Sequence, residues 1–151
     1  MRDLQRCPCG SGAPYSACCA PLHRGVHPAS DAVALMRSRY SAFAIGHVAY
    51  VWRTLHPLHE DRAQGETPFV AGLRRALRTQ RFRGLRILDS RAAGDEAQVL
   101  FHVRVVVQGV DRSFLELSTF LREPEGWLYL EGLCRAQDEA PELDIAGFQH
   151  P

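Results

Sequence analysis

Four of the five cysteines of this chain lie close together near the N-terminus, in the run Cys7-Pro-Cys9-Gly-Ser-Gly-Ala-Pro-Tyr-Ser-Ala-Cys18-Cys19. The loop between the two cysteine pairs contains glycine and proline, so it can fold back and bring the four thiols to one point. Four soft sulfur ligands are the donor set of a closed tetrahedral zinc site, which leaves no position for water and serves structure. The spacing therefore predicts structural zinc at Cys7, Cys9, Cys18 and Cys19.

Two alternatives to this zinc site are weaker. A set of disulfides would require a secreted chain, and the first six residues lead directly into the cysteines without the pattern of a signal peptide. We therefore expect a cytoplasmic protein, in which clustered thiols bind metal more often than they pair. His23 is the one nearby substitute ligand, and Cys19 is preferred over it because adjacent cysteines can both coordinate at a sharp turn.

The second set of residues that could do chemistry is a pair of glutamates, Glu116 and Glu131, in segments that are otherwise rich in apolar residues. A carboxylate in an apolar cavity has its protonation altered by desolvation, so such a residue can act as a general acid or base. The alternative to this catalytic role is a structural ion pair, because a buried carboxylate needs a partner.

The elements that must position these residues divide the chain into helices and then strands. The sequence predicts three helices: one that begins after Ser30 or Asp31 and ends at Gly46, a shorter one over residues 47–55, and one that starts at Thr67-Pro68. From Leu85 the period changes to two, and strands are expected over residues 85–91, 97–107, 112–122 and 127–135. This order predicts an α+β domain with helices on one face of an antiparallel sheet. We expect the acidic tail, residues 137–151, to be loosely ordered.

The register of the strands decides what the covered face of the sheet carries. With Gly109-Val110 as a two-residue turn, Glu116 lies opposite Val103, and the next hairpin pairs Phe120 with Tyr129. Glu116 and Glu131 then sit together among apolar side chains, and His102 lies on the other face as a surface histidine. A slip by one residue would instead place Glu116 on the open face.

Composition gives broad limits. The chain has 151 residues, of which 46% are hydrophobic and 23% charged, and a net charge of +1. These values are ordinary for a globular domain and give no reason to expect a membrane or nucleic acid as partner. All 18 basic residues are arginines, and several of them cluster between Arg74 and Arg86. We interpret this cluster as the solvated side of a helix and the following turn, with a basic face for an acidic partner or RNA as the alternative.

Several motifs together resemble one known family. The run from Cys7 to Cys19 resembles the SEC-C motif, and Leu35-Met-Arg-Ser-Arg-Tyr-Ser-Ala-Phe43 resembles the signature of the YchJ family of bacterial proteins. The resemblance continues through Thr54-Leu-His-Pro57, Glu116-x-Ser-x-Phe120 and Trp127-x-Tyr-x-Glu-Gly132. It implies a SEC-C zinc module over residues 1–28, a nuclear transport factor 2-like domain over 29–136 and a tail over 137–151. Such a domain has helices over a curved antiparallel sheet, in the form of a cystatin-like cone that encloses a pocket. The resemblance implies zinc as cofactor but does not indicate which activity, if any, the protein has.

The candidate residues of this pocket come from the first helix, the loop after the second helix and the last two strands. They are Arg37, Tyr40, His56, Glu116, Ser118, Trp127, Tyr129 and Glu131. We expect Arg37 or Arg39 to pair with Glu116 and to join the helix to the sheet. Cys134 is expected to be a buried core thiol and not a nucleophile.

These expectations favour a zinc-containing protein-interaction or adaptor module with an internal pocket, without enzymatic activity. We expect an unidentified protein partner, and a homodimer through the outer sheet face is left open. The alternative is a small-molecule-binding domain or an acid–base enzyme that uses the pocket. A filled cavity with an arginine bonded to Glu116 favours the first function. An open, roomy cavity with an unpaired carboxylate favours the second.

Overall fold

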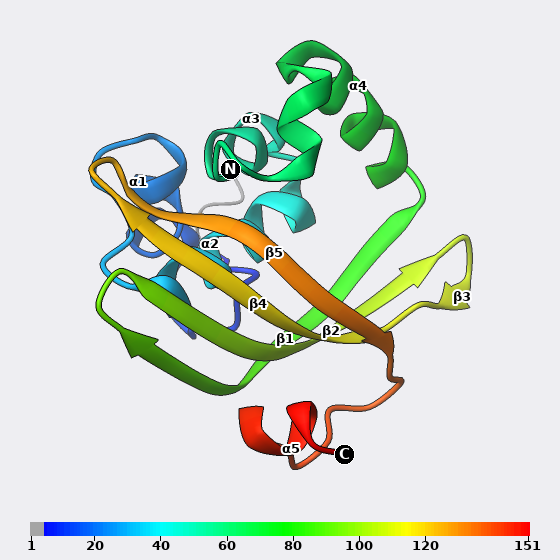
Figure 1. The fold of residues 1–151 in the computed structure, drawn as a ribbon. Helices are drawn as coiled ribbons and strands as arrows, with labels where there is room; N and C mark the ends of the chain where they lie inside the picture. Colours follow the sequence, from blue (N-terminus) through cyan, green and yellow to red (C-terminus); the bar gives the residue numbers. More distant parts are fainter. Residues whose placement is uncertain (1–4) are drawn as a thin grey trace.

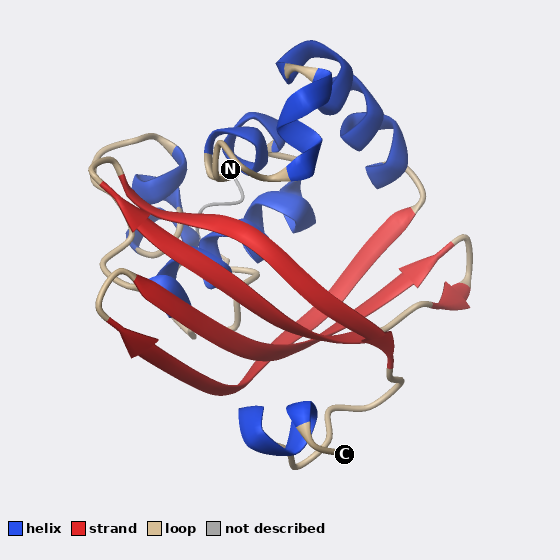
Figure 2. Ribbon diagram, viewed as in Figure 1, coloured by secondary structure: helices blue, strands red, loops and turns tan. Residues whose placement is uncertain are grey.

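The computed structural model describes residues 5–151, which form a curved antiparallel sheet with most of the helices on its concave side (Figures 1 and 2). The strands are β1 (Gln80–Ala93), β2 (Glu96–Val107), β3 (Val110–Asp111), β4 (Phe114–Glu123) and β5 (Gly126–Ala136), in the order β1-β2-β4-β5 with β3 paired to β2. The helices are η1 (Tyr15–Ala17), α1 (Ala20–His23), α2 (Ala32–Ile45), α3 (Val48–Arg53), η2 (Glu60–Gln64), α4 (Glu66–Leu77) and α5 (Ile145–Gln149). The predicted α+β class is confirmed.

Helix α2 lies against the concave face of the sheet, and its two ends follow from local chemistry. The Asp31 side chain accepts a hydrogen bond from the Ala34 N–H at 2.7 Å, which satisfies one of the free donors of the first turn. At the other end Gly46 adopts φ 82°, a conformation that glycine tolerates and that terminates the helix. Both ends agree with the prediction.

The arginine-rich segment divides between two elements. Strand β1 begins at Gln80, so Arg81, Arg83 and Arg86 belong to a strand and not to a turn after the helix. Bulges between Phe82 and Gly84 and between Ile87 and Asp89 interrupt the alternation of this strand. The six arginines between 74 and 86 are all exposed.

The β2–β4 register differs from the prediction by two residues. Gln108-Gly109 forms the two-residue turn between strands β2 and β3. This type of turn needs positive φ at both central positions, and the two residues have φ of 51° and 80°. Glu116 therefore lies opposite Phe101 and not opposite Val103. A shift of two residues keeps every side chain on its predicted face, so Glu116 still points to the concave side.

A bulge in the last hairpin changes the face of one predicted pocket residue. Phe120 pairs with Tyr129 as predicted, but Thr119 pairs with Glu131, so Leu130 is an extra residue in β5. Beyond the bulge the alternation is inverted, and Glu131 is exposed while Gly132 lies opposite Ser118. The prediction that Glu131 lies beside Glu116 on the covered face is wrong for this reason.

The C-terminal tail is ordered and covers part of the outer sheet face, where Figure 1 shows α5 on the side away from α2. Ile145 is 2% exposed and packs with Leu100, Leu115 and Leu117, which point outward from β2 and β4. The ring Nε2 of His102 lies 2.7 Å from the Gln137 carbonyl, so this histidine is buried. The expectations of a loosely ordered tail and a surface histidine are wrong, because the outer face is itself apolar and needs a cover.

Among the helices of residues 5–151, none combines the length and the apolar character that crossing a bilayer requires.

We predict that Ile145→Ala destabilises the domain by about 2 kcal/mol, because it removes buried apolar atoms between α5 and the sheet. The free energy of unfolding from urea titration measures this effect. Ala146→Ser, at the exposed neighbouring position, is the control and is expected to change the free energy of unfolding by less than about 0.5 kcal/mol. Equal unfolding midpoints for the two variants would contradict the packing of the tail.

Candidate functional site

The four N-terminal cysteines converge as the sequence predicts. The Sγ atoms of Cys7, Cys9, Cys18 and Cys19 all lie within 4.8 Å of one another. The Cys9 and Cys18 sulfurs are 3.6 Å apart and those of Cys18 and Cys19 are 4.0 Å apart, far longer than the about 2.05 Å of a disulfide. Zinc–sulfur bonds of about 2.3 Å in a tetrahedron place the sulfurs about 3.8 Å from one another. The cluster thus has the donors and the spacing of a four-sulfur metal site.

Hydrogen bonds within the cluster shift the pKa values of two of its thiols in opposite directions. The pKa of the Cys9 thiol is lowered because the Cys19 and Cys7 thiols donate hydrogen bonds to it. The pKa of Cys19 is correspondingly raised by its hydrogen bonds to Cys7 and Cys9. These hydrogen bonds favour the thiolate at Cys9 and the thiol at Cys19. A divalent metal is the group that would allow all four to ionise.

Helix α2 supplies polar contacts to the cysteine cluster. The Ser41 hydroxyl donates to Cys19 Sγ at 3.1 Å, and Arg37 Nη1 donates to the Cys9 carbonyl at 2.7 Å. On the other side the Ser11 hydroxyl lies 3.1 Å from Cys18 Sγ. Contacts of this kind orient metal ligands from outside the coordination shell. Arg37, predicted to line the pocket, points instead to the cysteine cluster.

His23 is not available as a metal ligand. Its Nε2 lies 2.8 Å from the Ser38 carbonyl and must donate to it, so Nδ1 accepts from the Tyr15 hydroxyl at 2.6 Å. Burial lowers the pKa of this imidazole, which favours the neutral ring that both bonds require. The preference for Cys19 over His23 agrees with these contacts, and His23 joins the cysteine module to α2.

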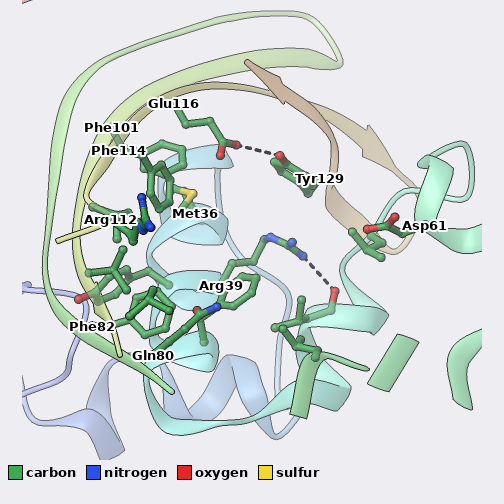
Figure 3. A pocket seen from close by; sticks show the side chains of 18 of the residues that line it. Met36, Arg39, Asp61, Gln80, Phe82, Phe101, Arg112, Phe114, Glu116 and Tyr129 are labelled. Carbon is green, nitrogen blue, oxygen red and sulfur yellow. Dashed lines mark hydrogen bonds between the residues drawn. The ribbon is translucent and has the colours of Figure 1, made fainter. Parts of the chain in front are cut away.

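The concave face of the sheet, α2, α3, η2 and α4 enclose a cavity of about 490 Å³ (Figure 3). Its volume lies within the roughly 300–1,000 Å³ of sites that bury a small organic ligand. The wall is mainly apolar, with polar groups at a few positions. The lining residues include Met36, Phe69, Leu73, Phe82, Phe101, Val103, Val105, Val107 and Phe114, and among the polar ones Arg39, His59, Asp61, Arg112, Glu116 and Tyr129.

Glu116 is held by three neutral donors. The Tyr129 hydroxyl donates to Oε2 at 2.8 Å, the Ser118 hydroxyl donates to the same oxygen, and the Cys134 thiol donates to Oε1 at 2.8 Å. Within residues 5–151 no arginine lies within ion-pair distance of this carboxylate. Burial, reinforced by the nearby carboxylate, raises the pKa of Tyr129, and it raises the pKa of Cys134 to about 12. Both groups are therefore protonated donors at neutral pH.

Arg39 enters the cavity wall from α2 but does not bond Glu116. It is 5% exposed, and its Nη1 donates to the Val51 carbonyl at 3.0 Å and to the Thr54 hydroxyl at 2.6 Å. Its guanidinium carbon lies 4.6 Å from the centre of the Tyr129 ring. The expected arginine–Glu116 network is wrong because Arg37 turns to the cysteines and Arg39 to α3 and Tyr129. Tyr129 contacts both charged groups, through its ring and its hydroxyl (Figure 3).

The other predicted pocket residues are distributed over several places. Tyr40 lines the cavity, and burial raises the pKa of its hydroxyl to about 12. Ser118 is buried behind Glu116. His56 is buried and bonds Glu123 at 2.8 Å, while Trp127 lines a separate cavity of about 240 Å³. These two residues were expected in the main pocket and lie outside it.

Cys134 departs from the prediction in a different way. The residue is exposed and not a buried core residue, because it lies on edge strand β5, although its Sγ turns inward to Glu116.

Two polar residues of the cavity wall were not anticipated from the sequence. His59 and Asp61 come from the start of η2, and the His59 ring lies 5.6 Å from that of Tyr129. His59 Nδ1 accepts from the Asp61 N–H at 3.0 Å, so the histidine caps its own 3-10 helix. Burial lowers the pKa of His59. The sequence carries no clear signal for this cap, because histidine is not among the preferred N-cap residues.

The fold and the cysteine cluster define a class of protein: a SEC-C motif ahead of a nuclear transport factor 2-like domain. The SEC-C motif model matches residues 5–21, and the model of the middle, nuclear transport factor 2-like domain of YchJ matches residues 31–132. The chain belongs to the YchJ family. The UPF0225 protein of Deinococcus radiodurans is 38% identical over 125 residues, which cover 83% of this chain and 86% of that protein.

Solved structures support the same fold. The solution structure of a SEC-C motif containing protein from Rhodopseudomonas palustris is 33% identical and superposes with a TM-score of 0.75, covering 89% of this chain and 100% of that one. A crystal structure of a SEC-C motif containing protein from Psychrobacter arcticus, 24% identical, superposes with a TM-score of 0.71 over 86% of this chain and 82% of that one. The likeness to the second structure concerns the fold alone.

We predict that Gly132→Ala disrupts the Glu116 site, because a Cβ at residue 132 would collide with the Glu116 carboxylate and lie 2.6 Å from the Tyr129 hydroxyl. Displacing both groups should destabilise the domain by about 1–3 kcal/mol in urea titrations. Gly84→Ala is the matched control, because a Cβ there meets no atom within 4 Å. If the two variants unfold at the same urea concentration, the close approach of β5 to Glu116 is wrong.

Proposed function

We propose that this protein binds an apolar small molecule in the conical cavity and that its four N-terminal cysteines hold a structural zinc ion. The observation that carries the first part is an open cavity of about 490 Å³ in which Glu116 has no arginine partner among the described residues. An arginine-bonded Glu116 in a filled cavity would have favoured a purely structural interior. Arg37 and Arg39 donate their hydrogen bonds to other groups, so this structural interpretation of Glu116 is not supported.

Zinc is supported by the chemistry of the donor set. Cys7, Cys9, Cys18 and Cys19 offer four sulfurs, which satisfy a tetrahedral ion and leave no coordination position for a substrate. The ion would hold the two cysteine pairs together and fix the carbonyl of Cys9 and the thiolate of Cys19 where α2 contacts them. Its contribution is to stability, and no chemical step is assigned to it.

Ligand binding is supported by the construction of the cavity wall. Strands β2 and β4 contribute apolar side chains from one side, and α2 contributes Met36 and Tyr40 from the other. Helix α4 contributes Phe69 and Leu73, yet none of its residues is buried. An apolar molecule that fills the cavity would cover these half-exposed side chains and gain the free energy of removing them from water.

Binding explains the polar groups better than acid–base catalysis does. Protein donors already occupy three of the about four acceptor positions of the Glu116 carboxylate, and Tyr129, with its raised pKa, keeps its proton. A general base needs a lone pair directed at the substrate proton. We therefore assign Glu116 to orienting Tyr129, and the cavity to recognition. The protein-interaction function expected from the sequence depended on a filled cavity, so it is not our first proposal.

We predict that Cys9→Ala and Cys18→Ala lose the bound zinc, whereas wild type and Cys134→Ala contain about one zinc ion per chain. Elemental analysis of the purified, desalted protein measures the metal content. Cys134 is a matched control because its thiol bonds Glu116, outside the cysteine cluster. Unchanged zinc in the first two variants would rule out the four-sulfur site.

We predict that the neutral fluorescent probe N-phenyl-1-naphthylamine binds in the cavity and that Val103→Phe weakens this binding at least about tenfold, because the larger side chain fills the cavity. The fluorescence increase on titration measures the affinity. Val106→Phe, on the opposite face of β2 and outside the cavity, is expected to bind the probe like wild type. Circular dichroism shows whether each variant is folded. Absence of probe binding to wild type, or equal binding by the two folded variants, would contradict the proposal.

A further inference from the structure

Arg39 is a buried cation without a carboxylate partner in the described part of the chain. It is 5% exposed and lies in the wall of the conical cavity, while the ion pairs of residues 5–151 involve other groups. Arginine keeps its charge even when burial lowers its pKa, as it does here. Removing an arginine from water is unfavourable unless an opposite charge compensates for it. The site therefore has a positive charge for which a ligand could supply the counterion.

The unused hydrogen bonds of Arg39 lie on one edge of its guanidinium. The two hydrogen bonds described for this group, to Val51 and Thr54, both come from Nη1. Nε and Nη2 have no described partner. In residues 5–151 the only fully buried side-chain nitrogen without a partner is Nε of Arg62, so the two Arg39 nitrogens are not fully buried. Arg39 lines the cavity, so the Nε–Nη2 edge is the part of its guanidinium that is left for a ligand there.

This edge has the geometry for a carboxylate. The Nε–H and Nη2–H bonds of a guanidinium point in parallel and match the two oxygens of a carboxylate group. The Tyr129 ring, 4.6 Å from the guanidinium carbon, covers one side of the group. The hydrogen bond from Tyr129 to Glu116 fixes the ring in turn. The edge is therefore pre-oriented before a ligand enters.

We propose that the ligand of the conical cavity is an apolar monocarboxylate, whose carboxylate forms a bidentate ion pair with the Nε–Nη2 edge of Arg39 and whose apolar part lies against Val103, Val105 and Phe101. This inference rests on the proposed binding function and adds the chemical class of the ligand.

The remaining groups of the wall limit the negative charge that a ligand can carry. Arg39 repels a cationic ligand, and Glu116 already accepts three hydrogen bonds from protein donors. Glu116 and Asp61 both line the cavity and repel a second negative charge, so a dianion such as a phosphate ester fits less well than a monoanion held by Arg39 (Figure 3). Most of the lining side chains are apolar, so a larger polar molecule would leave its own groups without partners.

The inference is tested on the wild-type chain with three probes of equal length and different charge: decanoate, decan-1-ol and decylamine. Each competes with N-phenyl-1-naphthylamine at neutral pH, below its micelle concentration. We expect decanoate to bind at least about tenfold more tightly than decan-1-ol, and decylamine to bind most weakly. Equal affinity of decanoate and decan-1-ol would overturn the charge assignment and leave the cavity as a binding site. Preference for decylamine would overturn it as well. No binding of any of the three, or of the fluorescent probe, would overturn the proposed function.

Variants test whether Arg39 is the residue that binds the carboxylate of the ligand. Arg39→Met should bind decanoate and decan-1-ol equally, and Arg39→Lys, which keeps the charge without the bidentate edge, should show a reduced preference for decanoate. Arg104→Met is the control, since Arg104 is exposed on the opposite face of β2 and does not line the cavity, and it should keep the full preference. A preference that survives in folded Arg39→Met, or that disappears in Arg104→Met, would show that Arg39 does not bind the carboxylate. Because the probe series uses the wild-type chain, a failure of the Arg39 variants to fold leaves that test intact.

Discussion

The packing of helix α2 between the cysteine cluster and the concave face of the sheet is the interaction on which both candidate sites depend. Along one side of this helix Arg37 and Ser41 bond to groups of the cysteine cluster, and along another Met36, Arg39 and Tyr40 form cavity wall. A helix that is contacted on both sides cannot shift towards one without leaving the other. The two sites therefore share one rigid element.

The curvature of the sheet is the second requirement, and it comes from irregularities in the strands. Bulges in β1 after Phe82 and after Ile87, and the one at Leu130 in β5, bend the sheet and widen its concave side. The bulge opposite Thr119 also decides which glutamate faces the cavity. It turns Glu131 to solvent and leaves Gly132 at the place where Glu116 and Tyr129 need room.

The parts of the fold that sequence reasoning predicted correctly depend on neighbours in the chain. The cap at Asp31, the end at Gly46 and the convergence of the cysteines follow from residue types at short spacing. The incorrect parts depend on contacts between distant segments. A local pattern cannot predict the bulge opposite Thr119 or the hydrogen bond of Arg39 to Val51. It cannot predict the packing of α5 over Leu100 either. The shift of two residues at Gln108-Gly109 did not change which face of the sheet each side chain was predicted to occupy, because an even shift preserves the face.

The position of α5 means that a fragment of this domain that lacks the C-terminal tail would expose apolar surface. The matched domain region ends at residue 132, before the segment that contains Ile145 and Phe148. A fragment trimmed to that boundary would carry Leu100, Leu115 and Leu117 as an uncovered apolar stripe on neighbouring strands. Stripes of this kind promote self-association in water, so aggregates of such a fragment would reflect the trimming and not the native oligomeric state.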